Sequence, residues 1–287
     1  MLKTVWLTEQ FNKASGTAIL LGGFDGLHAG HRQLLNRAKD SGLAVGIMTI
    51  VGGKQGDSLF TPLEREDIFL SAGADFVFEL PFEEIKDLSP QAFLALLEKE
   101  FSPKLFVCGE DFRFGAGAVG TPETLKTSTQ VRVEVLPLLE MEGEKVSSTH
   151  VKRLLQDGKV EKSGELLTHP YFLIGKVEEG RKVGRTMGFP TANIAYPKGT
   201  FPLKQGVYET RVEVDGVRYK GITNFGARPT FENEEVWTES YLDGFTGLLY
   251  GKTLKVEFVR FMREIKKFAS VEDLQAQLTK DIRQVRE

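Results

Sequence analysis

Two hydrophobic patterns divide the chain. In the first half, apolar runs such as Thr17–Leu21 and Leu43–Val51 alternate with segments that repeat apolar residues at helical spacing, such as His31–Lys39. The same pattern predicts helices over Pro62–Leu70, Ser89–Glu100, Ser148–Leu155 and Val160–Leu167, and strands over Asp75–Leu80, Lys104–Cys108 and Val131–Leu136. Alternating strands and helices of about ten residues predict a parallel sheet. Ligands of such sheets bind at the carboxyl ends of the strands.

The second half has the pattern of an antiparallel sheet. Val207–Val214 alternates in polarity, and Asp215-Gly216 is a hairpin signal before a second run at Val217–Gly221. This pattern predicts a small antiparallel barrel or sandwich. A last helix is expected after Ser270, a candidate N-cap. Its apolar stripe, which we interpret as a packing face, consists of Val271, Leu274, Leu278, Ile282 and Val285.

The change of pattern predicts two domains. It falls between residues 155 and 170, so we expect one domain over residues 1–160 and a second over residues 168–287. The total of 287 residues agrees with this division, because single domains contain about 100–150 residues.

Composition excludes several classes of protein. Lys and Arg number 37 against 40 Asp and Glu, so the net charge of −3 argues against a nucleic-acid partner bound by bulk charge. No apolar run approaches the roughly 20 residues that span a bilayer, and no signal peptide is recognised, so no membrane partner is expected. The single cysteine, Cys108, excludes an internal disulfide and suits a cytoplasmic protein. The oligomeric state is left open.

A glycine-rich turn between a predicted strand and a predicted helix is the strongest local motif, at Gly22–His31. Backbone N–H groups of such a turn, together with a helix N-terminus, form an anion site. His28 and His31 are three residues apart, so both can face the same phosphate and donate hydrogen bonds as charge develops. Two alternatives are a glycine turn with surface histidines and a zinc pair, for which nearby ligands are lacking.

A second motif lies at Val146–Arg153. Ser148 and Thr149 stand at the start of a predicted helix, with Lys152 one turn later. Hydroxyl and ammonium groups in this arrangement can hold a phosphate, whereas the alternative is an ordinary helix N-cap.

The strongest motif of the second half spans Gly180–Asn193. Three glycines spaced by four, with basic residues between them, suit a loop over phosphates. Thr191 and Asn193 offer the hard oxygen ligands that Mg²⁺ prefers. Asn224–Phe231 is interpreted as a loop that carries an arginine, and Glu239 on a predicted strand is a candidate general base. The alternatives are a basic surface loop and a solvated glutamate.

Together these motifs resemble known families. The turn Gly-Phe-Asp-Gly-x-His-x-Gly-His with the later Ser-Ser-Thr resembles the HxGH nucleotidyltransferases, and Val107–Gly115 resembles their flavin branch. Gly-Phe-Pro-Thr-Ala-Asn, then Asn-x-Gly-x-Arg-Pro-Thr-Phe, an acid and Leu249-Tyr-Gly251 resemble riboflavin kinase. The order is that of bacterial bifunctional riboflavin kinase/FAD synthetases. The resemblance implies a Rossmann-like parallel sheet followed by a small antiparallel β-barrel with a terminal helix.

The resemblance also implies two reactions. The C-terminal module would transfer the γ-phosphate of ATP to riboflavin, giving FMN, with Mg²⁺ at Thr191 and Asn193 and with Glu239 as base. The N-terminal module would join FMN to AMP from a second ATP, giving FAD and pyrophosphate, with His28 and His31 neutralising charge. The remaining implied residues bind ATP in the adenylyltransferase (Gly23, Phe24, Asp25, Gly26, Ser148, Thr149, Lys152), ATP in the kinase (Gly180, Arg181, Gly184, Arg185, Gly188) and flavin (Asp111, Phe114, Arg228).

Several positions depart from the family pattern. Residues 52–57 replace a Pro-His-Pro loop, Lys152 replaces an arginine, Leu248 replaces an acid, and Ile265 replaces a glutamate. Phe114 can stack on the flavin or pack in the core. The altered loop leaves open a kinase with a weakened adenylyltransferase. A non-catalytic flavin-sensing protein is the other alternative, although the retained polar residues argue against it.

Overall fold

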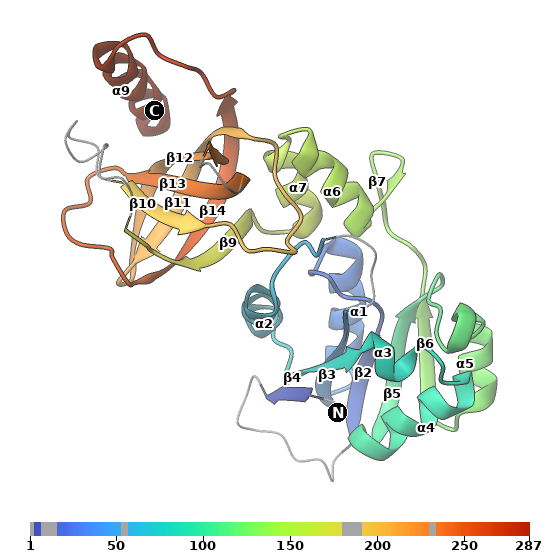
Figure 1. Ribbon diagram of the computed structural model, residues 1–287. Coiled ribbons are helices and arrows are strands. Elements are labelled where there is room, and N and C mark those ends of the chain that lie inside the picture. Colours follow the sequence, from blue (N-terminus) through green and yellow to red (C-terminus); the bar gives the residue numbers. More distant parts are fainter. Residues whose placement is uncertain (1–2, 7–15, 53–56, 180–190, 230–233) are drawn as a thin grey trace. The chain divides into compact units, whose positions relative to one another are not determined.

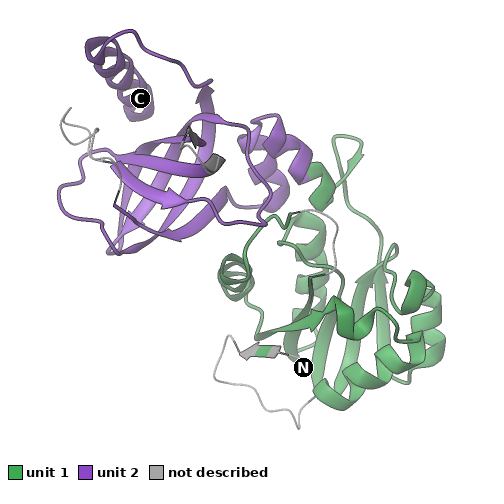
Figure 2. Ribbon diagram, in the orientation of Figure 1, with its two compact units in different colours: residues 1–150 green, residues 151–287 purple. Residues whose placement is uncertain are grey.

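The computed structural model describes residues 3–6, 16–52, 57–179, 191–229 and 234–287. The chain forms two compact units, residues 1–150 and 151–287 (Figure 2). The division falls inside helix α6 (Ser148–Gln156), so residues 151–160 group with the second unit. Within the described residues, no helix has the length and apolar character needed to cross a membrane.

The first unit is built on a parallel sheet, as the sequence predicts (Figure 1). Five parallel strands lie in the order β4-β3-β2-β5-β6, and β1 pairs antiparallel with β4 at the edge. The strands are β1 (Lys3–Trp6), β2 (Thr17–Leu21), β3 (Ala44–Val51), β4 (Phe76–Pro81), β5 (Pro103–Gly109) and β6 (Arg132–Leu136). Strand β2 is buried along its whole length, which explains its uninterrupted apolar sequence.

Helices connect these strands, and several of them begin at side-chain caps. Thr61 and Glu64 form a capping box at α2, and the Ser89 side chain accepts a hydrogen bond from the Ala92 N–H at α4. The helices of the first unit are α1 (Ala29–Lys39), α2 (Pro62–Ser71), α3 (Phe82–Ile85), α4 (Pro90–Phe101) and α5 (Pro122–Ser128). A two-stranded hairpin, β7 (Glu140–Met141) and β8 (Glu144–Lys145), precedes α6.

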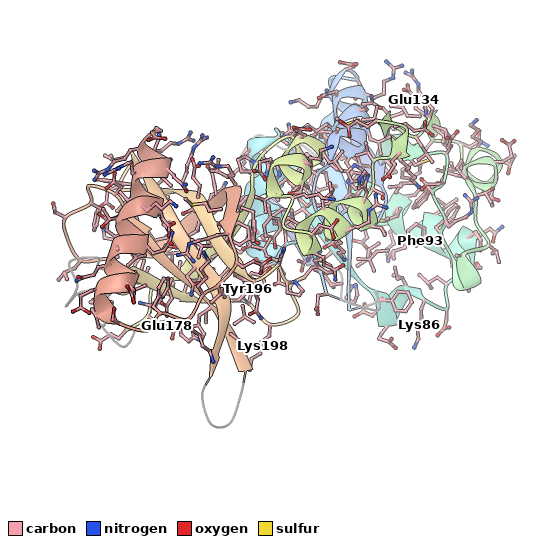
Figure 3. The ribbon with its side chains drawn as sticks, turned by 90° about the horizontal axis from the view of Figure 1, so that it is seen from above. Lys86, Phe93, Glu134, Glu178, Tyr196 and Lys198 are labelled. Atoms are coloured by element: carbon pink, nitrogen blue, oxygen red, sulfur yellow. The ribbon has the colours of Figure 1, made fainter. Side chains whose placement is uncertain are left out.

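The second unit is an antiparallel barrel, as predicted. Its strands lie in the order β10-β13-β12-β11-β14-β9. The two edge strands approach each other, because the N–H of Glu178, just after β9, donates to the carbonyl of Asn193 on β10 at 2.8 Å (Glu178 is labelled in Figure 3). The strands are β9 (Tyr171–Lys176), β10 (Thr191–Ala195), β11 (Gly206–Val214), β12 (Val217–Pro229), β13 (Glu234–Leu242) and β14 (Thr253–Arg263).

Helices α7 and α9 accompany the barrel in the described part of the second unit. Helix α7 (Val160–Leu167) packs against β9 and β14. The terminal helix α9 (Val271–Arg286) begins at the predicted cap, where the Ser270 side chain accepts from the Asp273 N–H at 3.1 Å. Of its apolar stripe, Ile282 and Val285 are buried against the sheet, so the predicted packing face is confirmed there.

One sequence interpretation is wrong. Asn224 to Pro229 do not form a loop but the last six residues of β12, which pair with Glu234–Glu239 of β13. The Gly, Pro and Arg content of this segment suggested a turn, yet cross-strand pairing with both β11 and β13 holds Asn224 in the sheet.

Candidate active sites

The first candidate site lies at the carboxyl ends of the parallel strands. Strand β2 is central: the chain continues to β3 and β4 on one side and returns to β5 and β6 on the other. Ligands bind where the strand order reverses in this way. A pocket of 340 Å³ opens there, lined by Leu21–Phe24 after β2 and by Gly109 and Asp111–Arg113 after β5. The predicted edge of the sheet therefore carries a pocket.

The histidines of the glycine-rich turn both line this pocket. Their rings stack, with centroids 3.5 Å apart and 19° between the planes. His28 is the N-cap of α1, and its Nδ1 accepts a hydrogen bond from the His31 N–H at 3.2 Å. The Nδ1 of His31 donates to the Gly26 carbonyl at 3.0 Å, because a carbonyl only accepts. In the neutral state the proton of His28 therefore sits on Nε2, and that of His31 on Nδ1.

The other residues of the turn divide into two groups. Gly23 and Phe24 line the pocket, and the Phe24 ring lies 4.4 Å from the His31 ring. Asp25 and Gly26 do not line it. Instead, the buried Asp25 carboxylate accepts from the Leu59 N–H at 3.0 Å. Asp25 therefore fixes the turn to the following segment of the same unit.

The motif at Val146–Arg153 also has only some of its residues at the pocket. Ser148 and Thr149 line the pocket, together with Ser147, whose hydroxyl accepts from the His150 N–H at 3.2 Å at the start of α6. Lys152 does not line it. Its Nζ lies 5.4 Å from the ring centroid of Phe201, within the second unit.

The residues expected to bind flavin occupy different environments. Asp111 lines the pocket and pairs with Lys145 of β8 at 2.5 Å. Phe114 is 5% exposed, does not line the pocket, and packs on Phe112 and on Phe93, which is labelled in Figure 3. The structure thus favours core packing for Phe114, while Phe112 faces the cavity.

Sequence reasoning missed several lining residues of this pocket. They come from the end of β5 and from the segment between β6 and α6: Phe112, Arg113, Pro137, Leu138, Leu139 and Lys145. Phe112 and Arg113 follow the carboxyl end of β5, where ligands of parallel sheets bind, so this rule could have identified them. No sequence signal marks the second group, because a short hairpin of ordinary composition brings it to the pocket.

The second candidate site lies in the barrel unit, on one row of cross-strand neighbours. Each member of the row is paired with the next: Asn193 on β10, Glu239 on β13, Asn224 on β12, Val207 on β11 and Arg263 on β14. Side chains of directly paired residues point to the same face of the sheet. The predicted ligand Asn193 and the predicted base Glu239 are therefore direct neighbours.

Two cavities in this unit share Thr191. The larger, of 350 Å³, is lined by Thr191, Glu239 and Asn224, and by apolar side chains that include Leu274, Leu278 and Ile282 of α9. The smaller, of 250 Å³, is lined by Thr191, Val177, Leu242, Phe245 and residues 247–250. Two of the residues that depart from the family pattern lie here: Ile265 lines the larger cavity and Leu248 the smaller.

The chemistry of Thr191 and Asn193 fits a magnesium ion. The Asn193 side chain donates its Nδ2 to the Thr191 carbonyl at 3.2 Å, so this hydrogen bond uses the amide nitrogen and not the amide oxygen. A threonine hydroxyl and an amide oxygen are hard, neutral ligands, and Mg²⁺ completes such sites with water and phosphate oxygens. The paired Glu239 adds a carboxylate on the adjacent strand.

Some expected residues lie outside the described part of the chain. Gly180, Arg181, Gly184, Arg185 and Gly188 belong to this group, as do residues 53–56 of the altered loop. The backbone of Arg228 is paired with Glu235 at the end of β12.

Comparison with known proteins agrees with this division into two sites. Residues 10–150 match the sequence family described as FAD synthetase, and residues 167–287 match the family described as riboflavin kinase. The bifunctional riboflavin kinase/FMN adenylyltransferase of Bacillus subtilis is 31% identical over 303 residues, covering 98% of this chain and 96% of its own. The Escherichia coli K12 protein of the same name is 33% identical over 293 residues, covering 93% and 90%.

A solved structure extends the likeness to three dimensions. A crystal structure described as a macrolide-efflux protein from Streptococcus pneumoniae superposes with a TM-score of 0.86 at 30% identity, covering 96% of this chain and 97% of that one. Both units therefore have counterparts in a single solved chain. With two family matches and relatives that are similar over almost the whole length, the chain belongs to the bifunctional riboflavin kinase/FMN adenylyltransferase family and carries a FAD synthetase domain followed by a riboflavin kinase domain.

Proposed function

We propose that the barrel unit phosphorylates riboflavin and that the parallel-sheet unit then adenylylates the FMN formed. In the first step the terminal hydroxyl of the ribityl chain attacks the γ-phosphorus of ATP, the bond from that phosphorus to the bridging oxygen breaks, and ADP leaves. The hydroxyl must lose its proton, and Glu239 is the carboxylate that accepts it. The pairing of Glu239 with Asn193 is the observation that carries this assignment.

Thr191 and Asn193 hold the metal in this proposal. Mg²⁺ held there with ATP would neutralise negative charge on the phosphate oxygens. Thr191 lines both cavities, so it stands where a nucleotide in the smaller cavity would meet an alcohol in the larger one. The apolar lining contributed by α9 suits the ring of a flavin.

The second step needs no strong base. The phosphate of FMN is already an anion near neutral pH, because the second pKa of a phosphate monoester is about 6. Its oxygen attacks the α-phosphorus of ATP, and pyrophosphate leaves with the bonding pair. The site must stabilise the charge that develops on pyrophosphate, and the Nε2–H of His28 is oriented for this by the hydrogen bond at Nδ1. His31, stacked on His28, and the hydroxyls of Ser148 and Thr149 complete the phosphate site.

A time course of flavin products tests this proposal. Purified protein is incubated with riboflavin, ATP and Mg²⁺, and flavins are separated by chromatography. We expect FMN first and FAD later. His31→Ala should stop at FMN, whereas Glu239→Gln should leave riboflavin unchanged but still convert supplied FMN to FAD. A Glu239→Gln variant that loses both steps equally would overturn the assignment of the reactions to two sites.

A further inference from the structure

Asn224 occupies a distinctive place in the kinase site. It is the neighbour of Glu239 on the side away from Asn193. Across the sheet, the proposed base Glu239 therefore lies between the proposed metal ligand Asn193 and the amide of Asn224. Asn224 lines the same 350 Å³ cavity as Glu239. Adjacent strands lie about 4.8 Å apart, so the amide stands one strand spacing from the base along the cavity floor.

The amide of Asn224 differs from two other polar groups of this cavity, which have partners on the protein. The Tyr241 hydroxyl contacts Asp243 at 3.5 Å, and the Arg263 guanidinium is paired with Asp281 at 2.7 Å. No hydrogen bond is made by the Asn224 side chain within the part of the chain that the structure describes. A carboxamide offers two donors and an acceptor, and on the half-buried Asn224 these groups are accessible to a ligand that enters the cavity. A bound ligand that carries hydroxyl groups would satisfy them.

The substrate of the proposed reaction has such groups at the matching place. This inference rests on the proposed kinase function. If Glu239 contacts the terminal hydroxyl of the ribityl chain, the next hydroxyls inward along that chain pass over the neighbouring strand, where Asn224 lies. Each hydroxyl both donates and accepts, as an amide does. Beyond Asn224 the row continues to Val207, an apolar neighbour suited to the flavin ring rather than to the polyol.

We propose that Asn224 is a specificity residue that binds the inner hydroxyls of the ribityl chain and thereby aligns the terminal hydroxyl with Glu239. The amide selects a polyol chain over an alkyl alcohol of equal length. Asn224 takes no part in proton transfer.

A comparison of two substrates tests this proposal. The first is riboflavin, and the second is a flavin that carries a 5-hydroxypentyl chain, which keeps the reacting hydroxyl but lacks the inner ones. We expect the wild-type protein to prefer riboflavin in kcat/KM by about tenfold or more, the effect of one or two hydrogen bonds. Asn224→Leu should lower kcat/KM for riboflavin by a similar factor and leave the value for the pentyl analogue unchanged, so the preference disappears.

Two controls separate this role from a structural one. Ile222 lies on the same strand and face as Asn224 and lines the same cavity. Ile222→Val should therefore change kcat/KM for both substrates by the same factor and keep the preference for riboflavin. Conversion of supplied FMN to FAD should be unaffected in both variants. If Asn224→Leu lowers kcat/KM for the two alcohols by the same factor, the proposal is wrong. Absence of riboflavin phosphorylation by the wild-type protein would instead overturn the proposed function itself.

Discussion

Arg263 on β14 and Asp281 on α9 form an ion pair in which Nε lies 3.1 Å and Nη2 lies 2.7 Å from the same carboxylate oxygen. The Asp281 side chain is only 2% exposed, and Gln277 of the same helix donates to its other oxygen at 2.7 Å. Arg263, Leu278 and Ile282 all line the larger cavity. The ion pair therefore connects α9, which forms one wall of the cavity, to β14 of the sheet.

Asp281→Asn should loosen that wall and destabilise the barrel unit. Removing one partner of a buried pair leaves the other charge uncompensated and costs about 3 kcal/mol. We expect a lower denaturant midpoint for this unit and a higher KM for riboflavin, measured by chemical unfolding and steady-state kinetics, with FAD formation from supplied FMN unchanged.

Asp243→Asn is the matched control for this prediction. Asp243 holds Arg286, which lies five residues after Asp281 on the same helix, at 2.8 Å for both Nε and Nη2. Arg286 is 63% exposed, so its ion pair contributes less to stability. Asp243 does not line the larger cavity, and the KM for riboflavin should stay near the wild-type value. An equal rise of KM in both variants would show that general loosening of α9, rather than the cavity wall, is responsible.

Gly26→Ala should impair adenylylation alone. A Cβ atom at this position would lie 2.9 Å from two carbon atoms of the Phe60 ring, which is fully buried. The turn must shift, and with it the Gly26 carbonyl that orients His31. Because small displacements of a catalytic group are costly, we expect FAD formation from FMN to fall by up to about 100-fold.

The control for this change is Gly164→Ala on α7. Its Cβ would meet other atoms only at 3.5 Å or beyond, which is ordinary contact. Both reactions should proceed at wild-type rates in this control. Riboflavin phosphorylation should also be unchanged in Gly26→Ala, and an unaltered rate of FAD formation in Gly26→Ala would contradict the positioning of His31 by the turn.

The single cysteine should resist alkylation in the native state. Cys108 lies on β5 with no exposed surface, and burial raises the pKa of its thiol from 9.0 to about 11. The thiolate is the reactive form, so a rise of two pKa units lowers its population about 100-fold at pH 8. Iodoacetamide labelling followed by mass spectrometry should be slow in buffer, fast in denaturant, and faster as the pH rises. Equal labelling rates in buffer and denaturant would show that the strand is open.

The elements that were predictable from sequence are those with strong local signals. Strand β2 has the predicted bounds Thr17–Leu21, and α9 begins at its predicted cap, Ser270. The pairing of His28 with His31 followed from their spacing on a turn before a helix. These features depend on residues that are close in sequence, where period and capping chemistry are decisive.

Features that depend on distant segments were not predictable in the same way. Asn224 faces Glu239 only because the register of β12 with β13 places it there, and sequence placed it in a loop. Lys145 reaches Asp111 through a hairpin that has no marked pattern. Phe114 sits in an aromatic core whose members come from several elements. Burial and register of this kind are tertiary properties, which local propensity does not encode.

Mixing two variants, each inactive at one site, tests most directly whether two independent sites act in succession. Glu239→Gln alone should leave riboflavin unchanged, and His31→Ala alone should accumulate FMN. Combined in one reaction with riboflavin, ATP and Mg²⁺, the two proteins should produce FAD, because FMN released by the intact kinase site of one is adenylylated by the intact second site of the other. A mixture that yields FMN but no FAD, with Glu239→Gln also inactive on supplied FMN, would contradict the account.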